Sequence, residues 1–477
     1  MSDQGRSGIR RRLLLKSSAI GLGLAALRVA PAEAAFDPIP GRIEKSGIAV
    51  ELVDFAAPPR TSAKRPYAHL NTLFHAGDGT RRLFTNDARG KLWQIDAKTG
   101  TARLVLDVAA ARAGRFVQDT SQMGLRSFAF HPDFGKADRP GHLKLYTLVT
   151  EAVAAPAPGA PLFDGPFQAI FHDVLLEWTA RSAGALTVDP GSARELLRIA
   201  QYKTDHNADQ VVFNLKAKSP DHPDYGKLYF GVGDGGNVLS HSDPFDQAQD
   251  GGQALGKIFR IDPLEQPDGS PYGIPKDNPF IGRKGYLGEV WALGLRHPQN
   301  ISFDLQGSRD LMLISDIGQS QIEEINIGRK GANYGWPARE GTFVTDRLNA
   351  QVLYPRPADD AKYGYTYPVA QYDHGEGRAV TGGYVYHNGP VKALRGHYLF
   401  GDIVSGRVFH VPYWKLWNGQ QATVRELTLK RGGAETTLLG LVGAPSRRVD
   451  LRFGQDERGE VYLLTKQDGK IRKMRPA

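Results

Sequence analysis

Short runs rich in β-branched and aromatic residues recur along the chain, and turns that contain Gly, Asp or Asn separate them. Most runs come in pairs, such as residues 82–85 and 92–95, which flank a turn at residues 86–90. Runs of this kind, without a sustained period of 3.6 residues, are typical of strands rather than helices. The pattern predicts an all-β protein.

The paired runs occur six times. Their first members contain, in order, Leu83, Leu145, Leu228, Leu311, Leu399 and Val461. These positions lie 62, 83, 83, 88 and 62 residues apart, which leaves room for four short strands and their loops each time. Radial repetition of four-stranded sheets forms a β-propeller around a central channel. We therefore expect a six-bladed β-propeller with four-stranded blades, in which residues 48–53 close the ring against the C-terminal blade. A pair of packed β-sheets is the alternative.

The N-terminus has the features of an export signal. Arg11 and Arg12 are followed by leucines and a lysine, then by an apolar, glycine-rich stretch at residues 19–27 and a small-x-small cleavage site (AEA). This order is typical of a twin-arginine (Tat) signal, and the stretch is shorter than the about 20 residues of a spanning helix. We expect a Tat signal peptide over residues 1–34, a single propeller domain over residues 35–477, no membrane span and a periplasmic location.

Composition excludes several classes of site. The chain contains no cysteine, so a disulfide framework, a thiolate zinc site and covalent Cys-x-x-Cys-His haem attachment are all ruled out. The net charge is +9, but the predicted signal carries six basic and two acidic residues, which leaves about +5 for the remainder. Because the basic residues are scattered rather than grouped, nucleic-acid binding is not indicated.

Common catalytic and nucleotide motifs are also missing. Residues 231–236 (GVGDGG) match Gly-x-Gly-x-x-Gly after a strand, yet residues 237–244 indicate a loop where a dinucleotide site needs a helix. The chain has no Gly-x-Ser-x-Gly nucleophile elbow and no His-Glu-x-x-His zinc helix. We interpret residues 231–236 as a turn.

Three loop segments carry candidate chemistry. Asp205 stands beside His206, and a carboxylate next to an imidazole can orient it as a base; the alternative is a loop histidine bound to backbone. Arg296 is a lone cation in a loop bounded by Gly and Pro, where a surface ion pair is the alternative role. Residues 315–319 (SDIGQ) and 323–324 offer oxygen atoms suited to calcium, or else form an acidic, solvated turn.

Six motifs occur together in one order. They are residues 124–134 (GLRSFAFHPDF), 205–207 (DHN), 228–236 (LYFGVGDGG), 274–279 (IPKDNP), 294–299 (GLRHPQ) and 331–337 (GANYGWP). This set resembles the glucose/sorbosone dehydrogenase family from about Tyr67 to the C-terminus. The resemblance implies a six-bladed propeller and, in the enzymatic members, a soluble quinoprotein sugar dehydrogenase. Its cofactors would be pyrroloquinoline quinone (PQQ) and calcium at the channel mouth.

The resemblance also implies roles for the catalytic residues. His206 would be the general base that removes the proton from the anomeric hydroxyl of the sugar while hydride passes to the quinone. Asp205 would orient His206 and tune its basicity. Arg296 would stabilise the negative charge that develops on the reduced quinone oxygen. A base, a fixed cation and a Lewis acid suit this chemistry.

For the cofactors, the resemblance implies that Gln122 contacts PQQ or substrate and that the backbone carbonyls of Gly318 and Gln319 hold calcium. Two positions depart from the family pattern: Val404 stands where members that bind the quinone present a lysine, and His297 stands where asparagine is usual. Four arginines could replace the missing cation, namely Arg378, Arg407, Arg447 and Arg448. We take Gln122, Arg296, His297, Arg407 and Arg447 as the expected cofactor-binding residues.

Three functions remain open from the sequence. The first is a periplasmic PQQ-dependent aldose dehydrogenase that passes electrons to an external cytochrome or quinone. The second is a non-enzymatic propeller that binds a carbohydrate or a protein, as in hedgehog-interacting proteins, which share the variant turn around Val404. The third is a calcium-dependent hydrolase of a sugar lactone, suggested by the acidic turns and by analogy with other propellers.

Overall fold

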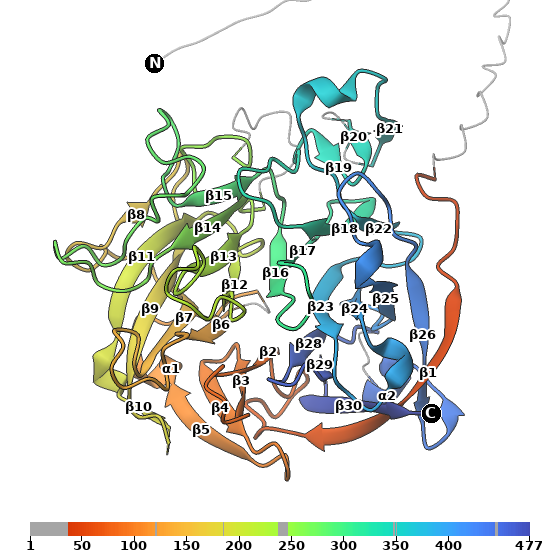
Figure 1. Cartoon of the computed structure of the whole chain (residues 1–477), viewed down its shortest axis with the longest axis horizontal. Coiled ribbons are helices and arrows are strands. Elements are labelled where there is room, and N and C mark those ends of the chain that lie inside the picture. Colours follow the sequence, from red (N-terminus) through yellow and green to blue (C-terminus); the bar gives the residue numbers. More distant parts are fainter. Residues whose placement is uncertain are drawn as a thin grey trace, which may run out of the picture. The chain divides into compact units, whose positions relative to one another are not determined.

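Strands make up most of the regular structure, and strands that follow each other along the chain pair side by side (Figure 1). The computed structural model describes residues 37–477 except 120–121, 185, 237–246, 347–348, 350 and 444–446. Residues from Pro38 to Ala477 form one compact unit. The predicted signal peptide lies outside the described residues. The prediction of an all-β protein is confirmed.

The long strands fall into consecutive groups whose neighbours pair antiparallel. The first three groups are β2 (Leu70–His75), β3 (Leu83–Asp87), β4 (Lys91–Ile95) and β5 (Ala102–Asp107); β6 (Leu125–Phe130), β7 (Lys144–Glu151), β9 (Phe171–Ser182) and β11 (Arg194–Gln201); and β12 (Ala208–Phe213), β13 (Leu228–Val232), β14 (Lys257–Ile261) and β15 (Val290–Leu293). The later groups are β16 (Pro298–Phe303), β17 (Met312–Asp316), β18 (Ile322–Ile327) and β22 (Ala370–Asp373); β23 (Val380–Tyr386), β24 (His397–Asp402), β25 (Val408–Pro412) and β26 (Arg425–Arg431); and β28 (Leu451–Gln455), β29 (Val461–Thr465) and β30 (Lys470–Pro476).

Shorter elements decorate these groups. They are β8 (Leu162–Phe163), β10 (Thr187–Val188), β19 (Arg339–Glu340), β20 (Phe343–Thr345), β21 (Leu353–Pro355), β27 (Ala434–Glu435), α1 (Val108–Ala111), α2 (Leu438–Val442) and 3₁₀ turns at Pro190–Ser192, Asp360–Tyr363, Lys392–Leu394 and Tyr413–Lys415. No helix among the described residues is long and apolar enough to cross a membrane.

The first strand of each group lies toward the centre of the unit, and the remaining strands extend outward (Figure 1). In cyclic order, β2, β6, β12, β16, β23 and β28 each contact the next, and β28 contacts β2. Central strands such as β6 and β12 are buried along their whole length, whereas the outer strand β5 is partly exposed. Such a cycle of contacts between central strands is expected when sheets are arranged in a ring, and not when two sheets pack face to face. The six repeated runs identified in the sequence fall at or beside the second strands of these groups.

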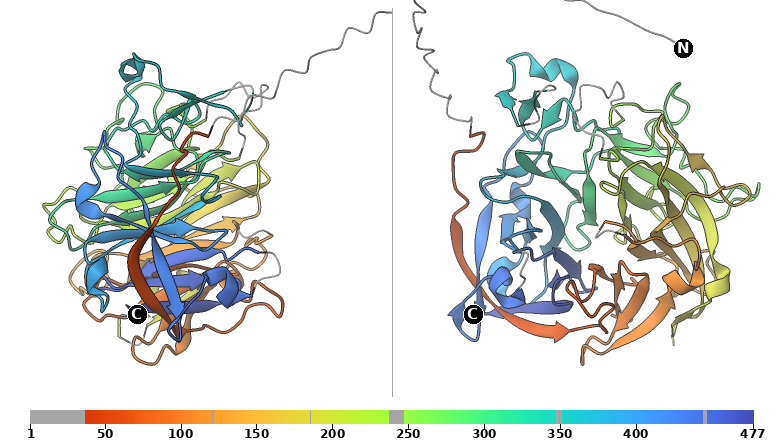
Figure 2. Two further views of the ribbon diagram at one scale, coloured as in Figure 1. Left: turned by 90° about the vertical axis from the view of Figure 1, so that its right-hand side faces the viewer. Right: turned by 180° about the vertical axis from the view of Figure 1, so that it is seen from behind.

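The N-terminal strand β1 (Lys45–Ala56) precedes the first group in the chain but pairs with strands of the last two groups. It pairs parallel with β26 and antiparallel with β30, and Figure 2 shows it beside β26. Val50 and Leu52 alternate with outward-facing residues and pack with Leu429 and Met474 in one apolar cluster. The prediction that residues 48–53 pair with the C-terminal strands is confirmed.

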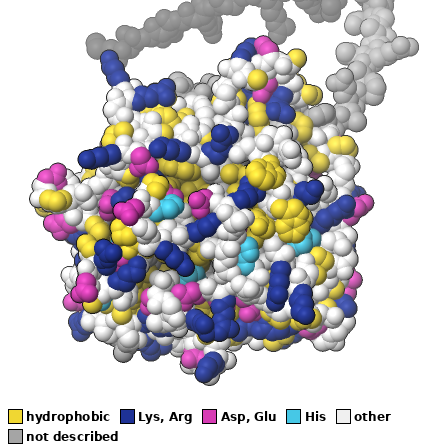
Figure 3. All heavy atoms as spheres, in the orientation of Figure 1, with side chains coloured by type: hydrophobic (Ala, Val, Ile, Leu, Met, Phe, Trp, Pro, Cys, Tyr) yellow, Lys and Arg dark blue, Asp and Glu magenta, His cyan; other side chains and the backbone are white. Residues whose placement is uncertain are grey.

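Charged side chains of both signs are interspersed over the face that Figure 3 shows. Lys and Arg side chains occur singly or in small groups across this face rather than in one basic area. This distribution agrees with the scattered basic residues of the sequence.

Leu52→Ala tests whether β1 holds the ring together. The side chain is 0% exposed, so its truncation leaves a cavity between β26 and β30 and is expected to lower the free energy of unfolding by about 2–5 kcal/mol. Val53→Ala is the matched control, because Val53 is 42% exposed and its loss is expected to cost less than about 1 kcal/mol. Urea denaturation followed by circular dichroism measures both. Equal midpoints for the two variants would contradict the closure role of β1.

Candidate functional site

The candidate residues lie at one end of the channel because of the antiparallel strand order. Where two strands pair antiparallel, the start of the first strand faces the end of the second. His206 therefore comes before β12 and close to Asp234, which follows β13. Arg296 comes before β16, in the next group, and its carbonyl accepts a hydrogen bond from the backbone N–H of Asp234 (2.8 Å). The sequence-predicted base and cation are thus brought together.

The ring of His206 is held by a contact at its Nδ1 edge and by stacking on one face. Its Nδ1 lies 2.6 Å from Asp234 Oδ1, and its ring stacks on that of His297 with the centroids 4.9 Å apart. The backbone of His206 has a φ of 58°, in the left-handed region that residues with a Cβ rarely adopt. A carboxylate accepts hydrogen bonds, so the short contact indicates that Nδ1 of the neutral ring carries the proton and donates it to Asp234. The lone pair then lies on Nε2, for which no hydrogen bond to a described residue is found.

Electrostatics keep this imidazole neutral. Burial, followed by the positive charge of Arg296, lowers the pKa of His206 to about 4, although Asp234 acts in the opposite direction. Burial raises the pKa of Asp234, but His206 and Arg296 outweigh it and bring that pKa to about 2. At neutral pH the pair is therefore a neutral imidazole beside a carboxylate, which is the state in which Nε2 can accept a proton.

The orienting contact predicted for Asp205 is made by Asp234 instead. Asp205 Oδ1 accepts a hydrogen bond from Gln122 Nε2 (3.1 Å), while Gln122 Oε1 accepts from the backbone N–H of His206 (3.0 Å). The left-handed backbone of His206 turns its side chain away from that of Asp205, so sequence neighbourhood did not identify the partner. Asp234 Oδ2 also accepts from Trp336 Nε1 (2.8 Å), which ties the residue 331–337 motif to the base.

Sequence reasoning missed Asp234 because it treated residues 231–236 only as a turn. The available signal was a carboxylate directly after a strand, at the same end of the fold as His206. Gln122, for which the resemblance implied contact with PQQ or substrate, lies against the loop that carries His206.

Arg296 is bound by the loop that the resemblance assigned to calcium, and one of the two implied calcium ligands, the Gly318 carbonyl, accepts from it. Its Nε and Nη2 donate to Gln319 Oε1 (2.9 and 2.5 Å), and its Nη1 donates to the carbonyls of Ile317 (2.8 Å) and Gly318 (2.6 Å). One Nη2 hydrogen is left for a ligand. Calcium requires six to eight oxygen ligands, and here the Gly318 carbonyl already accepts from a guanidinium whose positive charge opposes a cation, so the arrangement does not fit a calcium ion. Among the described residues, no three His, Asp or Glu side chains gather as a metal site.

His297, the other departure beside Arg296, belongs to a buried ion-pair network. Its Nε2 lies 2.6 Å from Asp209 Oδ2, and the other oxygen of Asp209 pairs with Arg126. The backbone N–H groups of Arg296 and of His297 each donate to the carboxylate of Asp316. This network fixes the ring on which His206 stacks, so His297 acts on the site by packing.

The two late arginines do not join His206. Arg407 pairs with Glu426 (2.6 Å) and Glu376 (2.8 Å), which neutralises its charge between β25 and β26. Arg447 is exposed, and within the described part of the chain no ion pair of its side chain is found. The backbone around Val404 faces the same end of the channel, because the N–H of Val449 donates to the Val404 carbonyl (2.9 Å).

Comparison with known proteins matches the chain to one protein family. The family model described as Glucose / Sorbosone dehydrogenase matches residues 187–473. The HIPL2 protein of Arabidopsis thaliana is 28% identical over 466 residues, which cover 86% of this chain and 62% of that protein. Quinoprotein glucose dehydrogenase B of Acinetobacter calcoaceticus is 29% identical over 274 residues, covering 55% and 48%. The chain thus spans less than two thirds of the length of these relatives. Hedgehog-interacting proteins of mouse and human match at 26% identity.

Solved structures show the same fold. The PQQ-bound aldose sugar dehydrogenase of Streptomyces coelicolor superposes with a TM-score of 0.54 at 18% identity, covering 90% of this chain and 98% of that one. Its likeness concerns the arrangement of strands, whereas the family match rests on the sequence of more than half the chain. The chain belongs to the glucose/sorbosone dehydrogenase family.

Proposed function

We propose that the protein is a periplasmic oxidoreductase that oxidises an aldose at its anomeric carbon, with PQQ as hydride acceptor and an external cytochrome or quinone as the final acceptor. The observation that carries the proposal is a neutral imidazole, His206, whose Nε2 is open and which lies beside the fixed charge of Arg296. Membership of a sugar dehydrogenase family and the fold shared with a PQQ-bound relative support it.

The groups of strands support a six-bladed propeller with four-stranded blades. In this proposal the N-terminal strand β1 is the outermost strand of the last blade, beside β30. A blade of this kind leaves the site residues on loops at one channel mouth, where a rigid ring of strands holds them.

The residues at the mouth fit an anionic quinone. Arg296 retains one N–H and its charge for a ligand, and Arg452, at the start of β28, contributes a second cation that is 9% exposed. Lys466 adds a buried amine without a hydrogen-bond partner among the described residues. Carboxylates are the natural partners for such groups. When bound, PQQ supplies a two-electron acceptor for the hydride.

Residues of the protein accept the proton and stabilise the charge that develops during the reaction. His206 Nε2 removes the proton of the anomeric hydroxyl, and the resulting imidazolium is stabilised through Nδ1 by Asp234. Trp336 and the backbone N–H of Gly236 hold Asp234 in the orientation that keeps Nε2 free. Arg296 provides positive charge where negative charge develops. The sugar loses a hydride and a proton, which gives the lactone of the aldose.

His206→Asn is expected to lower turnover by roughly 10²–10⁴-fold, because the amide retains some hydrogen bonding but cannot accept a proton. His142→Asn, in a loop outside the site, is the control and should leave turnover unchanged. A dye-linked aldose assay with added PQQ measures both, and a PQQ titration shows whether cofactor binding is kept. Full activity in His206→Asn would place the base elsewhere. Wild-type protein that binds no PQQ would reject the dehydrogenase.

The pH profile gives a second test. Because the pKa of His206 lies near 4, the base stays unprotonated as the pH falls from 8 to 6. The acid limb of log kcat/KM attributable to His206 is therefore expected below pH 6, rather than near 6.5. Asp234→Asn removes the anion that raises this pKa, so it should move the limb to still lower pH while reducing kcat. A limb near pH 6.5 in the wild type would contradict the buried, neutral imidazole.

Calcium is expected to have no effect on the wild-type melting temperature. Since Arg296 already binds Gly318 and the Gln319 side chain, the native state offers calcium no competitive site there. Melting curves in excess calcium and in chelator are compared, with Arg296→Ala as the variant that frees the oxygen atoms. A clear rise in the wild-type melting temperature with calcium would show that the guanidinium gives way to the ion.

Export by the Tat pathway belongs to the same proposal, since PQQ sugar oxidation with external electron transfer suits the periplasm. The support is the Arg11-Arg12 pair before the apolar stretch. Replacing both with Lys is expected to leave precursor in the cytoplasm, as measured by fractionation and immunoblotting. Unchanged periplasmic yield would contradict a Tat route.

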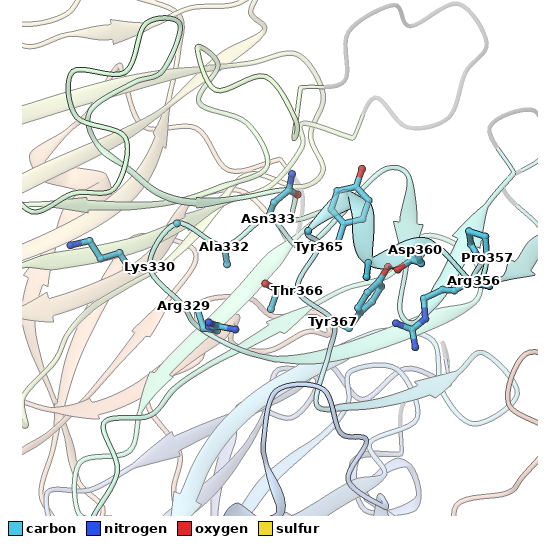
Figure 4. A pocket seen from close by; sticks show the side chains of 14 residues that line it. Arg329, Lys330, Ala332, Asn333, Arg356, Pro357, Asp360, Tyr365, Thr366 and Tyr367 are labelled. Atoms are coloured by element: carbon cyan, nitrogen blue, oxygen red, sulfur yellow. Dashed lines mark hydrogen bonds between the residues drawn. The ribbon is translucent and has the colours of Figure 1, made fainter.

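A second candidate function, a carbohydrate-binding module, is favoured by a cavity of about 800 Å³ beside β19–β21. Figure 4 shows Arg329 and Lys330 at one end of this pocket and Arg356 at the other, with Tyr365 and Tyr367 between them. Cationic and aromatic side chains in a polar cavity suit an acidic sugar. This function would gain support if the wild type bound an oligosaccharide but no PQQ.

A further inference from the structure

Lys466 carries a buried amine that has no hydrogen-bond partner among the described residues. The residue follows β29 and is 1% exposed, and its Nζ makes no hydrogen bond to any described residue. An unsatisfied ammonium in the interior is costly, and buried polar groups of native proteins are paired in the great majority of cases. Such an atom indicates a place for an anionic ligand.

Its position is next to the site of the missing lysine. Val404 lies in the turn between β24 and β25, and Lys466 lies in the turn between β29 and β30, which is the corresponding turn of the neighbouring group. The N–H of Val449 donates to the Val404 carbonyl (2.9 Å), and the N–H of Lys466 donates to the Asp450 carbonyl (3.3 Å). The consecutive residues Val449 and Asp450 are therefore hydrogen-bonded to one turn each and connect the two turns. Lys466 thus provides a cation beside the turn where the family pattern has one.

The charged groups around Lys466 leave an excess of positive charge. Those that face it are Arg452 on β28, Arg126 on β6, Asp209 on β12, Asp450 before β28 and, before β2, the neutral His69. Both carboxylates are engaged elsewhere: Asp209 pairs with Arg126 and His297, and Asp450 with Arg448 and Gln467. Neither ring nitrogen of the buried His69 has a partner among the described residues. Among the described residues, neither carboxylate is therefore left to pair with Arg452 or Lys466.

We propose that Lys466, supported by Arg452, binds a carboxylate of PQQ and replaces the lysine that is absent at position 404. This assignment rests on the proposed function. A carboxylate at Lys466 Nζ supplies the missing hydrogen-bond acceptor and balances the excess charge, which are the two defects of the ligand-free arrangement.

The assignment has a consequence for protons. Burial, followed by the charges of Arg452 and Arg126, holds the pKa of Lys466 well below its usual value. An anion placed against the amine favours the ammonium form and raises this pKa. At a pH between the pKa of Lys466 without the ligand and its pKa with the ligand, PQQ binding is therefore coupled to proton uptake by Lys466, a coupling that a merely structural lysine lacks.

The first test compares Lys466→Met with Lys470→Met by titrating PQQ into each full-length mature protein and following tryptophan fluorescence. Lys470 is the matched control: it lies four residues away, its side chain is 41% exposed, and it pairs with Asp54 outside the channel. We expect at least a tenfold rise in Kd for Lys466→Met and no change for Lys470→Met. Lys466→Met should melt no lower than wild type, because it removes an unpaired buried amine. Adding Val404→Lys to Lys466→Met should restore part of the affinity.

The second test measures proton uptake by titration calorimetry in two buffers with different ionisation enthalpies. Wild type is expected to take up protons on binding PQQ at pH 7, and Lys466→Met to take up fewer. A folded Lys466→Met that binds PQQ as tightly as wild type, with equal proton uptake, would overturn the assignment alone. Wild type that binds no PQQ would overturn the assignment together with the dehydrogenase proposal.

Discussion

Pairing of β1 with both β26 and β30 is the constraint on which the rest of the structure depends. The ring of sheets is built from strands that follow each other along the chain, so its first and last groups would otherwise meet only where β2 lies against β28, with one parallel pair at Leu73 and Gly454. A strand taken from the N-terminus supplies backbone hydrogen bonds to the last two groups and covers their edges. Every loop at the channel mouth takes its position from this closed ring.

Burial of charge at the mouth is the second consequence of that closure. The starts of the central strands converge there, and they bring His206, Arg296, Asp209 and Arg452 into an interior of low polarity. Each ionisable group there must then pair with an opposite charge, be neutral, or bind a charged ligand. His206 is neutral and Asp209 is paired, whereas Lys466 has no hydrogen-bond partner among the described residues and is the group to which we assign a ligand.

Much of the fold could be predicted from the sequence because strand patterns are local. The repeated runs mark the second strands of the groups, and residues 48–53 were expected to close the ring before any pairing was known. The adjacency of His206 and Arg296 followed from the family resemblance. The partners of the candidate residues could not be predicted in this way. Asp234 comes close to His206 only because β12 pairs with β13. Glu426, which neutralises Arg407, comes close to it only because β25 pairs with β26.

The same limit explains the calcium and lysine positions. A sequence shows that Gly318 and Gln319 offer carbonyl oxygens, but not that Arg296 already binds the Gly318 carbonyl and the Gln319 side chain. It also shows Val404 in place of a lysine without revealing that Lys466 lies in the adjoining turn. Departures from a family motif are therefore best judged by the charge balance of the folded site, where another element can supply the group that one turn has lost.

The most direct measurement is a crystal structure of the protein soaked with PQQ and an aldose. The account predicts that PQQ lies at the channel mouth with its quinone oxygen against Arg296, one carboxylate at Lys466, and the anomeric hydroxyl of the sugar within hydrogen-bonding distance of His206 Nε2. A channel mouth without PQQ, with sugar found only in the pocket beside β19–β21, would contradict the dehydrogenase and favour a binding module.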